Sequence, residues 1–247
     1  DRSKYIIDVD NPPDRLKDLF DFEKMTPRDG VKIFRSFDWG YSAPFCCLWS
    51  FPDYEGRLHF YREMYGNKKG QNLGIQLPTR DIAIKIKEIE DAHSEKPVLS
   101  VADASIYDKP SNLHEKAEKL PSHAEIMGQE GIWFDEQLSK DVKKPHSILS
   151  GVGQIHERLR IDADGMAGMY IFSTLTNWWR TMTALPIDLQ NPEIYDTEAE
   201  DHLADTTRYI LLARPFKTTK AHKRPHVDSL EFINKNFYHK EKEKEAW

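Results

Sequence analysis

The chain has 247 residues, with 41 acidic residues against 35 lysines and arginines and a formal net charge of −6. This length suits one large domain with extensions and is ample for a hydrophobic core. No apolar run approaches the roughly 18 residues that a membrane span needs, so no membrane association is expected. The cysteines Cys46 and Cys47 are adjacent in a strand-like run, where side chains point to opposite faces, which disfavours a disulfide and favours a reducing cytosol.

The N-terminal part of the chain predicts an arm followed by a β-meander. Residues 1–29 are polar and contain prolines, and we interpret them as a linker or packing arm. Strands are expected at 31–38, 44–51 and 57–65, with glycine- and proline-containing turns between them. This close spacing is typical of antiparallel strands joined in sequence.

The rest of the chain alternates between helical and strand patterns. Isoleucines at 82, 86 and 89 form one face of a helix over 79–92. Further strands are expected at 97–103, 131–134 and 168–173, and further helices at 110–120, 145–160, 174–184 and 198–213. Residues 215–247 form a charged C-terminal extension. The pattern predicts an α/β domain over 30–214, with a mixed sheet (antiparallel meander plus parallel strands) flanked by helices on both faces.

Three widely separated aspartates lie at the ends or starts of these elements. Asp38 closes the first strand of the meander, Asp103 closes the strand over 97–103, and Asp205 lies in the last helix. Each one alone could be a turn or cap residue. Carboxylates that are gathered together repel one another unless a cation neutralises them, so the set indicates Mg²⁺ or Mn²⁺ chemistry.

The last helix carries further polar residues near Asp205. Residues three or four apart share a helix face, which places both His202 and Asp201 beside Asp205. The remaining positions are mostly apolar, so the helix is expected to be largely buried. A simpler interpretation also stays open, in which acids decorate a helix N-terminus and Arg208 pairs with Asp205 or Asp201.

The net negative charge is unfavourable for an enzyme that binds nucleic acid, because phosphate binding needs positive surface. Basic side chains nevertheless cluster in two places, and a solvated surface would explain either cluster alone. The weak candidates for phosphate contacts are Lys140, Lys143, Lys144, Arg158 and Arg160. We therefore expect weak, salt-sensitive DNA binding by this chain alone.

Four segments carry a family resemblance over about residues 31–213. They are Phe37-Asp-Trp-Gly-Tyr-Ser-Ala-Pro44, Gly56-Arg-Leu-His-Phe-Tyr-Arg-Glu63, Ala102-Asp-Ala-Ser105 and Asp201-His-Leu-Ala-Asp-Thr-Thr-Arg-Tyr209. In this order they resemble the C-terminal nuclease domain of the large terminase subunit of tailed bacteriophages, the DNA-packaging motor. The last segment is the most specific, because it is similar to the family's Asp-His-x-x-Asp-Ala-x-Arg-Tyr signature.

The resemblance implies an RNase H-like, metal-dependent endonuclease that cuts double-stranded concatemeric viral DNA during headful packaging. Asp38, Asp103 and Asp205 would be catalytic and would bind two Mg²⁺ or Mn²⁺ ions, and His202 would be a catalytic residue beside the metals. The implied partners are double-stranded DNA, the terminase ATPase domain, the small subunit and the portal. The implied location is the cytoplasm of a bacterial host, with the gene carried by a phage or prophage.

The sequence departs from the family pattern at two positions and lacks one motif. Ala43 stands where many relatives have an acid, and Thr206 replaces the usual alanine. No segment has the Walker A spacing of an ATPase, since Gly66-Asn-Lys-Lys-Gly70 does not fit it. We therefore expect a nuclease part that is separate from the motor.

Three rival functions stay open at this stage. One is another RNase H-like nuclease, such as a junction resolvase or a transposase. A second is an actin-like phosphotransferase, since Asp38-Trp-Gly40 resembles its first phosphate loop, although Asp162-Ala-Asp-Gly165 is a poor second loop. The third is a non-catalytic packaging or portal-docking module.

Overall fold

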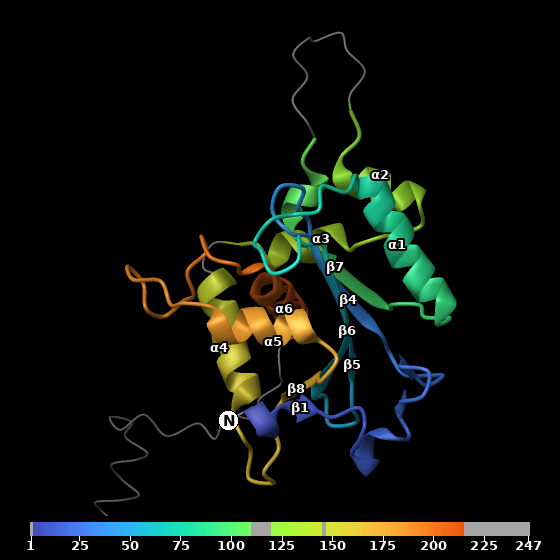
Figure 1. Ribbon diagram of the computed structural model, residues 1–247, viewed down its shortest axis with the longest axis vertical. Helices are drawn as coiled ribbons and strands as arrows, with labels where there is room; N and C mark the ends of the chain where they lie inside the picture. Colours follow the sequence, from blue (N-terminus) through green and yellow to red (C-terminus); the bar gives the residue numbers. More distant parts are fainter. Residues whose placement is uncertain (1, 110–119, 145–146, 215–247) are drawn as a thin grey trace, which may run out of the picture. The chain divides into compact units, whose positions relative to one another are not determined.

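The computed structural model describes residues 2–109, 120–144 and 147–214 (Figure 1). A six-stranded sheet in the order β1-β8-β6-β5-β4-β7 is its centre. The strands of this sheet are β1 (Ile6–Ile7), β4 (Phe34–Asp38), β5 (Cys46–Pro52), β6 (Leu58–Tyr65), β7 (Leu99–Ala102) and β8 (Met169–Phe172). A separate two-stranded hairpin consists of β2 (Phe20–Asp21) and β3 (Thr26–Pro27).

The sheet is mixed, as the sequence predicts. Strands β4, β5 and β6 pair antiparallel in sequence order and form the expected meander. The later strands then add in parallel, β7 beside β4 and β8 beside β6, and β1 pairs with β8 at the edge. Parallel addition of β7 and β8 is possible because long connections that contain helices separate them from the meander.

The α-helices are α1 (Thr79–Ala92), α2 (His123–Gln129), α3 (Glu136–Asp141), α4 (Ser147–Leu159), α5 (Thr176–Ala184) and α6 (His202–Ala213). Helix α6 lies against β4, β5 and β7, and α4 and α5 pack beside it, while α1 and α2 lie on the other side of the sheet (Figure 1). Three short 3₁₀ helices are Arg2–Lys4, Asp14–Leu16 and Ala104–Tyr107. Helices on both faces are therefore confirmed.

Strand alternation decides which face each residue of the meander meets. Arg35 of β4 and Trp49 of β5 face α1, where both donate to the buried carboxylate of Glu90 at 2.7 and 2.9 Å. The next residues along the strands face α6 instead, and Cys46, the register partner of Asp38, contacts Thr206 there. Because side chains alternate with a period of two, Asp38 lies on the α6 face of the sheet.

The N-terminal segment is built into the domain. Strand β1 extends the sheet, and Phe20 is fully buried, with its ring 5.5 Å from that of Phe51 and 4.8 Å from that of Phe172. Leu16 is also fully buried. Aromatic burial on this scale contributes several kcal/mol, so these residues are part of the core.

Several elements differ from the prediction. Residues 131–134 form no strand; Gly131 follows the end of α2 with a φ of 82°, and Asp135 then caps α3 through the Leu138 amide. Ile132 is nevertheless fully buried, so the apolar pattern of residues 131–134 reflects burial and not pairing in the sheet. The short helices α2 and α3 were not predicted, and the last helix begins at His202 instead of 198.

The helix expected at 110–120 falls outside the described residues except for its last position, and so does the extension over 215–247. Among the helices that the structure describes, none is long and apolar enough to cross a membrane.

Candidate active site

Two of the predicted aspartates meet at one edge of the sheet. Strands β4 and β7 are parallel neighbours with Phe37 opposite Ala102, so their carboxyl ends coincide. The Asp103 amide continues the pairing by donating to the Phe37 carbonyl at 3.0 Å. Asp38 and Asp103 are 9% and 5% exposed. The two carboxylates are therefore held side by side, mostly out of water.

Helix α6 brings the third aspartate to this edge. The Tyr209 hydroxyl lies 2.7 Å from Oδ2 of Asp103 and 3.0 Å from Oδ2 of Asp205, one helical turn away. A phenol hydroxyl has a single proton, so it can donate to only one of the two carboxylates at a time. Tyr209 thus sits between two carboxylates that are close to each other, and the three predicted aspartates converge.

The electrostatics reflect this crowding. Burial, and then the charges of Asp205 and Asp103, raise the pKa of Asp38 to about 6, against the opposing hydrogen bond from His202. Burial and the charge of Asp205 likewise raise the pKa of Asp201 to about 7. Carboxylates whose ionised forms are destabilised in this way favour a nearby cation.

Two basic side chains of the protein neutralise part of this negative charge. The Lys143 ammonium pairs with Asp103, and the Arg208 guanidinium pairs with Asp205 at 2.9 Å. The pairing of Arg208 with Asp205 is the contact that the simpler interpretation of the helix anticipated. Burial raises the pKa of Asp103, but the bond with Lys143 and the amide of Ser105 outweigh burial and hold that pKa below its usual value.

His202 begins α6 and lies between two polar partners. Its Nδ1 is 3.3 Å from Oδ2 of Asp38, and its Nε2 is 3.2 Å from Oδ1 of Asn72. Burial alone lowers the pKa of His202, but the hydrogen bond and charge of Asp38, with the charge of Asp201, outweigh burial and raise that pKa. Thr206, the departure from the family signature, is buried and donates to the His202 carbonyl at 2.6 Å.

The donor set suits a hard divalent cation, although the side chains are not arranged around one. In the part of the chain that the structure describes, no group of three or more His, Cys, Asp or Glu side chains has the geometry of a metal site. Carboxylate oxygens are the ligands that Mg²⁺ and Mn²⁺ prefer. Lys143, whose side chain is 45% exposed, is the group that a cation at Asp103 would displace.

A groove of about 540 Å³ opens beside Asp205. Its lining includes Lys143, Lys144, Asn191, Thr197, Asp201 and Arg208. The Lys144 side chain is 67% exposed and pairs with Asp141, an exposed contact that contributes little to stability. Two lysines thus border the groove that leads to the carboxylates.

The other basic residues predicted to contact phosphate lie elsewhere. Lys140 pairs with Glu136 at 2.6 Å on α3, and Arg160, which follows α4, pairs with Glu157 in the last turn of that helix at 3.1 Å. Arg158 corrects the prediction outright: it is 2% exposed and donates to the carbonyls of Gly168 and Arg214 at 3.0 and 2.6 Å. A buried guanidinium committed to backbone carbonyls cannot meet a DNA phosphate.

Sequence reasoning missed three side chains at the site. Tyr209 ends the segment 201–209 that carries the family resemblance, but the sequence analysis assigned no role to it. Tyr195, from the loop before α6, donates to Asp205 and lies 3.2 Å from Nε of Arg208. Asn72, from the connection between β6 and α1, had no spacing relation to any acid. Of the three, only Tyr209 could have been found from the sequence, because it lies four residues after Asp205 and therefore shares its helix face.

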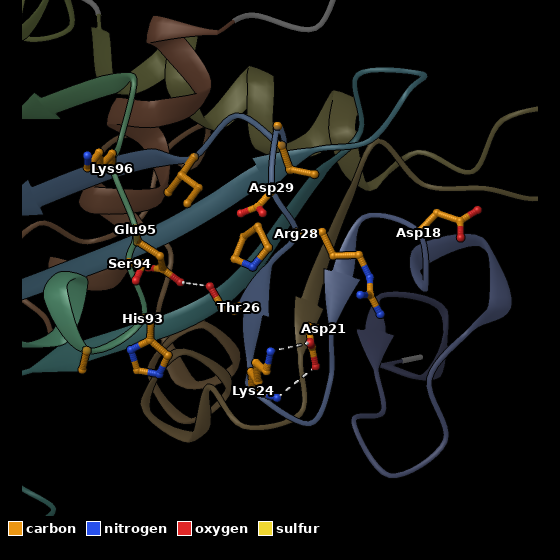
Figure 2. Close-up of a pocket in the computed structure, with 15 residues that line it drawn as sticks. Asp18, Asp21, Lys24, Thr26, Arg28, Asp29, His93, Ser94, Glu95 and Lys96 are labelled. Carbon is orange, nitrogen blue, oxygen red and sulfur yellow. Dashed lines mark hydrogen bonds and ion pairs between the residues drawn. The ribbon is translucent and has the colours of Figure 1, made fainter.

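A larger cavity than this groove, of about 1040 Å³, is not at this site. It lies between the β2–β3 hairpin and the end of α1, as Figure 2 shows, and Thr26 there donates to Glu95 at 2.7 Å. Its lining mixes acids such as Asp21 with bases such as Lys24 and Arg28. The three converging aspartates do not line it, so cavity size does not mark the site.

No family profile and no curated protein matches the sequence. Solved structures do match the fold. The large terminase of a thermophilic bacteriophage, in complex with ADP, matches with a TM-score of 0.57 and 14% identity, over 88% of this chain and 44% of that one. Another crystal form of the same terminase matches with a TM-score of 0.55 and 15% identity, over 85% and 42%. The chain therefore spans less than half the length of these terminases.

A shorter structure delimits the matching part. The nuclease domain of the P22 large terminase matches with a TM-score of 0.53 and 12% identity, over 87% of this chain and 90% of that domain. At such identities the likeness establishes the fold. This chain therefore has the RNase H-like fold of the nuclease domain of a large terminase.

Proposed function

We propose that this chain is a metal-dependent endonuclease that cuts double-stranded DNA. The observation that carries the proposal is the convergence of Asp38, Asp103 and Asp205 at one sheet edge, on a fold shared with a terminase nuclease domain. Fold alone does not establish function, so the weight rests on the carboxylates. Lys143 and Arg208 pair with Asp103 and Asp205, but three adjacent acids in a mostly buried site stay costly, and a bound divalent cation would lower that cost.

The three aspartates would hold two Mg²⁺ or Mn²⁺ ions, which when bound supply Lewis-acid chemistry for phosphodiester hydrolysis. The other residues have supporting roles in this proposal. Arg208 and Tyr195 fix the orientation of Asp205 through their contacts with its Oδ1 and Oδ2. His202, beside Asp38, is placed to hold or move a proton at its Nδ1.

In its biological setting, we propose that the domain cuts concatemeric viral DNA during headful packaging in the cytoplasm of a bacterial host. Its partners would be the terminase ATPase domain, the small subunit and the portal. The likeness to the thermophilic phage terminase, whose structures include complexes with ADP and ATP-gamma-S, supports this setting. An acidic domain gains from such partners, because they raise the local concentration of DNA at its site.

The test is digestion of linear and supercoiled plasmid with Mg²⁺, with Mn²⁺ and with EDTA. Cleavage is expected with either metal and not with EDTA. Asp38→Asn should leave the DNA intact. Its matched control is Asp162→Asn, which changes an exposed acid in the loop before β8 that lies outside the site. Cleavage of branched but not linear DNA would favour a resolvase, and intact DNA under all conditions would favour a non-catalytic packaging module.

Lys144 is expected to contribute to DNA binding, because it borders the groove at Asp205 and is mostly exposed. Lys144→Ala should weaken binding about 3- to 10-fold at low salt and reduce the slope of log K against log[salt] by about 1. Fluorescence anisotropy with a labelled duplex in EDTA measures both. Lys140→Ala is the matched control, since Lys140 pairs with Glu136 away from the groove. Equal effects of the two substitutions would contradict the assignment of the groove.

A further inference from the structure

We propose that Asn72 is a positioning residue of this site, which holds the His202 imidazole toward Asp38. The inference rests on the proposed nuclease function and adds to it a residue outside the acid cluster. Asn72 lies in the hairpin formed by residues 67–74, which joins β6 to α1.

Both ring nitrogens of His202 have a partner in the structure. Nδ1 faces Asp38 at 3.3 Å, and Nε2 faces the Asn72 amide oxygen at 3.2 Å. An asparagine amide offers both a donor and an acceptor, since its oxygen and nitrogen exchange places when the group turns over. Asn72 can therefore bond to Nε2 whether or not that nitrogen carries a proton, and so keep the ring in place in either state.

The hairpin is fixed against the loop that follows Asp38. The Gly74 amide donates to the Ser42 carbonyl at 2.7 Å. A Cβ added at Gly74 would lie 2.3 Å from the carbonyl oxygens of both Ala43 and Tyr41, so only glycine allows this approach. The backbone of the hairpin and the loop after β4 are thus tied together, and the place of Asn72 is set by the fold.

Asn72 also determines which of two acids the His202 ring faces. Nδ1 of His202 lies 3.9 Å from Oδ1 of Asp201, only slightly farther than from Asp38. The two carboxylates compete for the same ring nitrogen, and a ring held at one point only can turn between them. Because the contact with Asn72 fixes the opposite nitrogen, the ring stays directed at Asp38.

The first test is a set of single and double substitutions assayed for cleavage at saturating metal. Asn72→Ala is expected to lower kcat about 3- to 10-fold, the worth of one hydrogen bond, with an unchanged KM for DNA. In the His202→Ala background the same substitution should have no further effect, because Asn72 acts through the ring. Gln71→Ala, at the exposed neighbouring position, should leave kcat unchanged.

A second control separates positioning from folding of the hairpin. Asn67 donates from its side chain to the Gln71 carbonyl at 3.3 Å and does not contact His202, so Asn67→Ala should leave kcat within about 2-fold. The proposal would be overturned if Asn67→Ala lowered kcat as much as Asn72→Ala does. It would also be overturned if Asn72→Ala lowered kcat in the His202→Ala background by the same factor as in wild type. A raised KM with unchanged kcat would also overturn it, because Asn72 would then be a DNA contact.

A spectroscopic measurement decides the inference even if wild type does not cleave DNA, which would be a failure of the proposed function alone. NMR of ¹⁵N-labelled histidine reports the hydrogen bonding of each ring nitrogen. The Nε2 resonance of His202, assigned by its loss in His202→Ala, should shift in Asn72→Ala and stay unchanged in Gln71→Ala. An unshifted Nε2 resonance in Asn72→Ala would show that the amide does not hold the ring.

Discussion

Asp38→Asn is expected to abolish cleavage and at the same time to raise thermal stability. Loss of a charged metal ligand should lower the rate by at least about 10³-fold, since electrostatic stabilisation dominates such chemistry. The gain in stability follows from the environment of Asp38, where burial and two neighbouring carboxylates raise the pKa from 3.8 to about 6. A shift of this size corresponds to about 2–3 kcal/mol of destabilisation once the group is ionised in the folded protein.

The sign of the pH dependence follows from the raised pKa. Below about pH 4 the carboxyl is protonated in both the folded and unfolded states and costs nothing. As the pH rises from about 4 to about 6, only the unfolded chain gives up this proton readily, so wild type should lose stability over that range. Asp38→Asn removes this loss and should raise Tm at pH 7.5 by roughly 4–10 °C, with little change at pH 4.

Differential scanning calorimetry in EDTA at the two pH values measures this difference. Added Mn²⁺ should then raise the Tm of wild type more than that of Asp38→Asn, since a cation that binds only the folded protein stabilises it. Asp162→Asn is again the control for a changed acid outside the site. A lower Tm for Asp38→Asn at pH 7.5 would mean that the bond with His202 outweighs the crowding.

Arg208→Met is expected to have the largest cost in stability, about 3–5 kcal/mol, because it leaves Asp205 without its buried partner. Arg208 is 1% exposed, and its guanidinium also lies 3.2 Å from Ser147 Oγ and 3.4 Å from the Val142 carbonyl. The side chain passes over Gly151 of α4, where an added Cβ would lie 2.0 Å from Arg208 Cγ. One residue thus joins α6, α4 and the acid cluster.

Urea unfolding followed by circular dichroism measures this cost, and Arg208→Lys is the matched variant. Lysine keeps a positive charge near Asp205 but lacks the planar fork that reaches several partners, so it should recover only part of the loss. Cleavage by the folded fraction of Arg208→Met should also fall, because Asp205 loses the contact that orients it. A loss of less than about 1 kcal/mol would show that Tyr195 and Tyr209 hold Asp205 by themselves.

Local patterns in the sequence determined the elements and two parts of the site. Apolar runs that end at Asp38 and Asp103 marked the strands β4 and β7, and the helical period placed His202 and Asp201 on the face of Asp205. These inferences hold because strand alternation and helix spacing are properties of a few consecutive residues. The hydrophobic pattern alone did not distinguish a buried irregular segment from a strand paired in the sheet, as residues 131–134 show.

Only the tertiary structure decided which distant side chains meet. The parallel pairing of β7 with β4 brings Asp103 to Asp38, and no local window contains that pairing. The same holds for Asn72, which reaches His202 because a glycine lets its hairpin lie against the loop after β4. Arg158 resembled a DNA contact in sequence, yet its guanidinium is buried and committed to backbone carbonyls. Contacts between residues far apart in the chain depend on the packing of whole elements, which the pattern of any one segment does not specify.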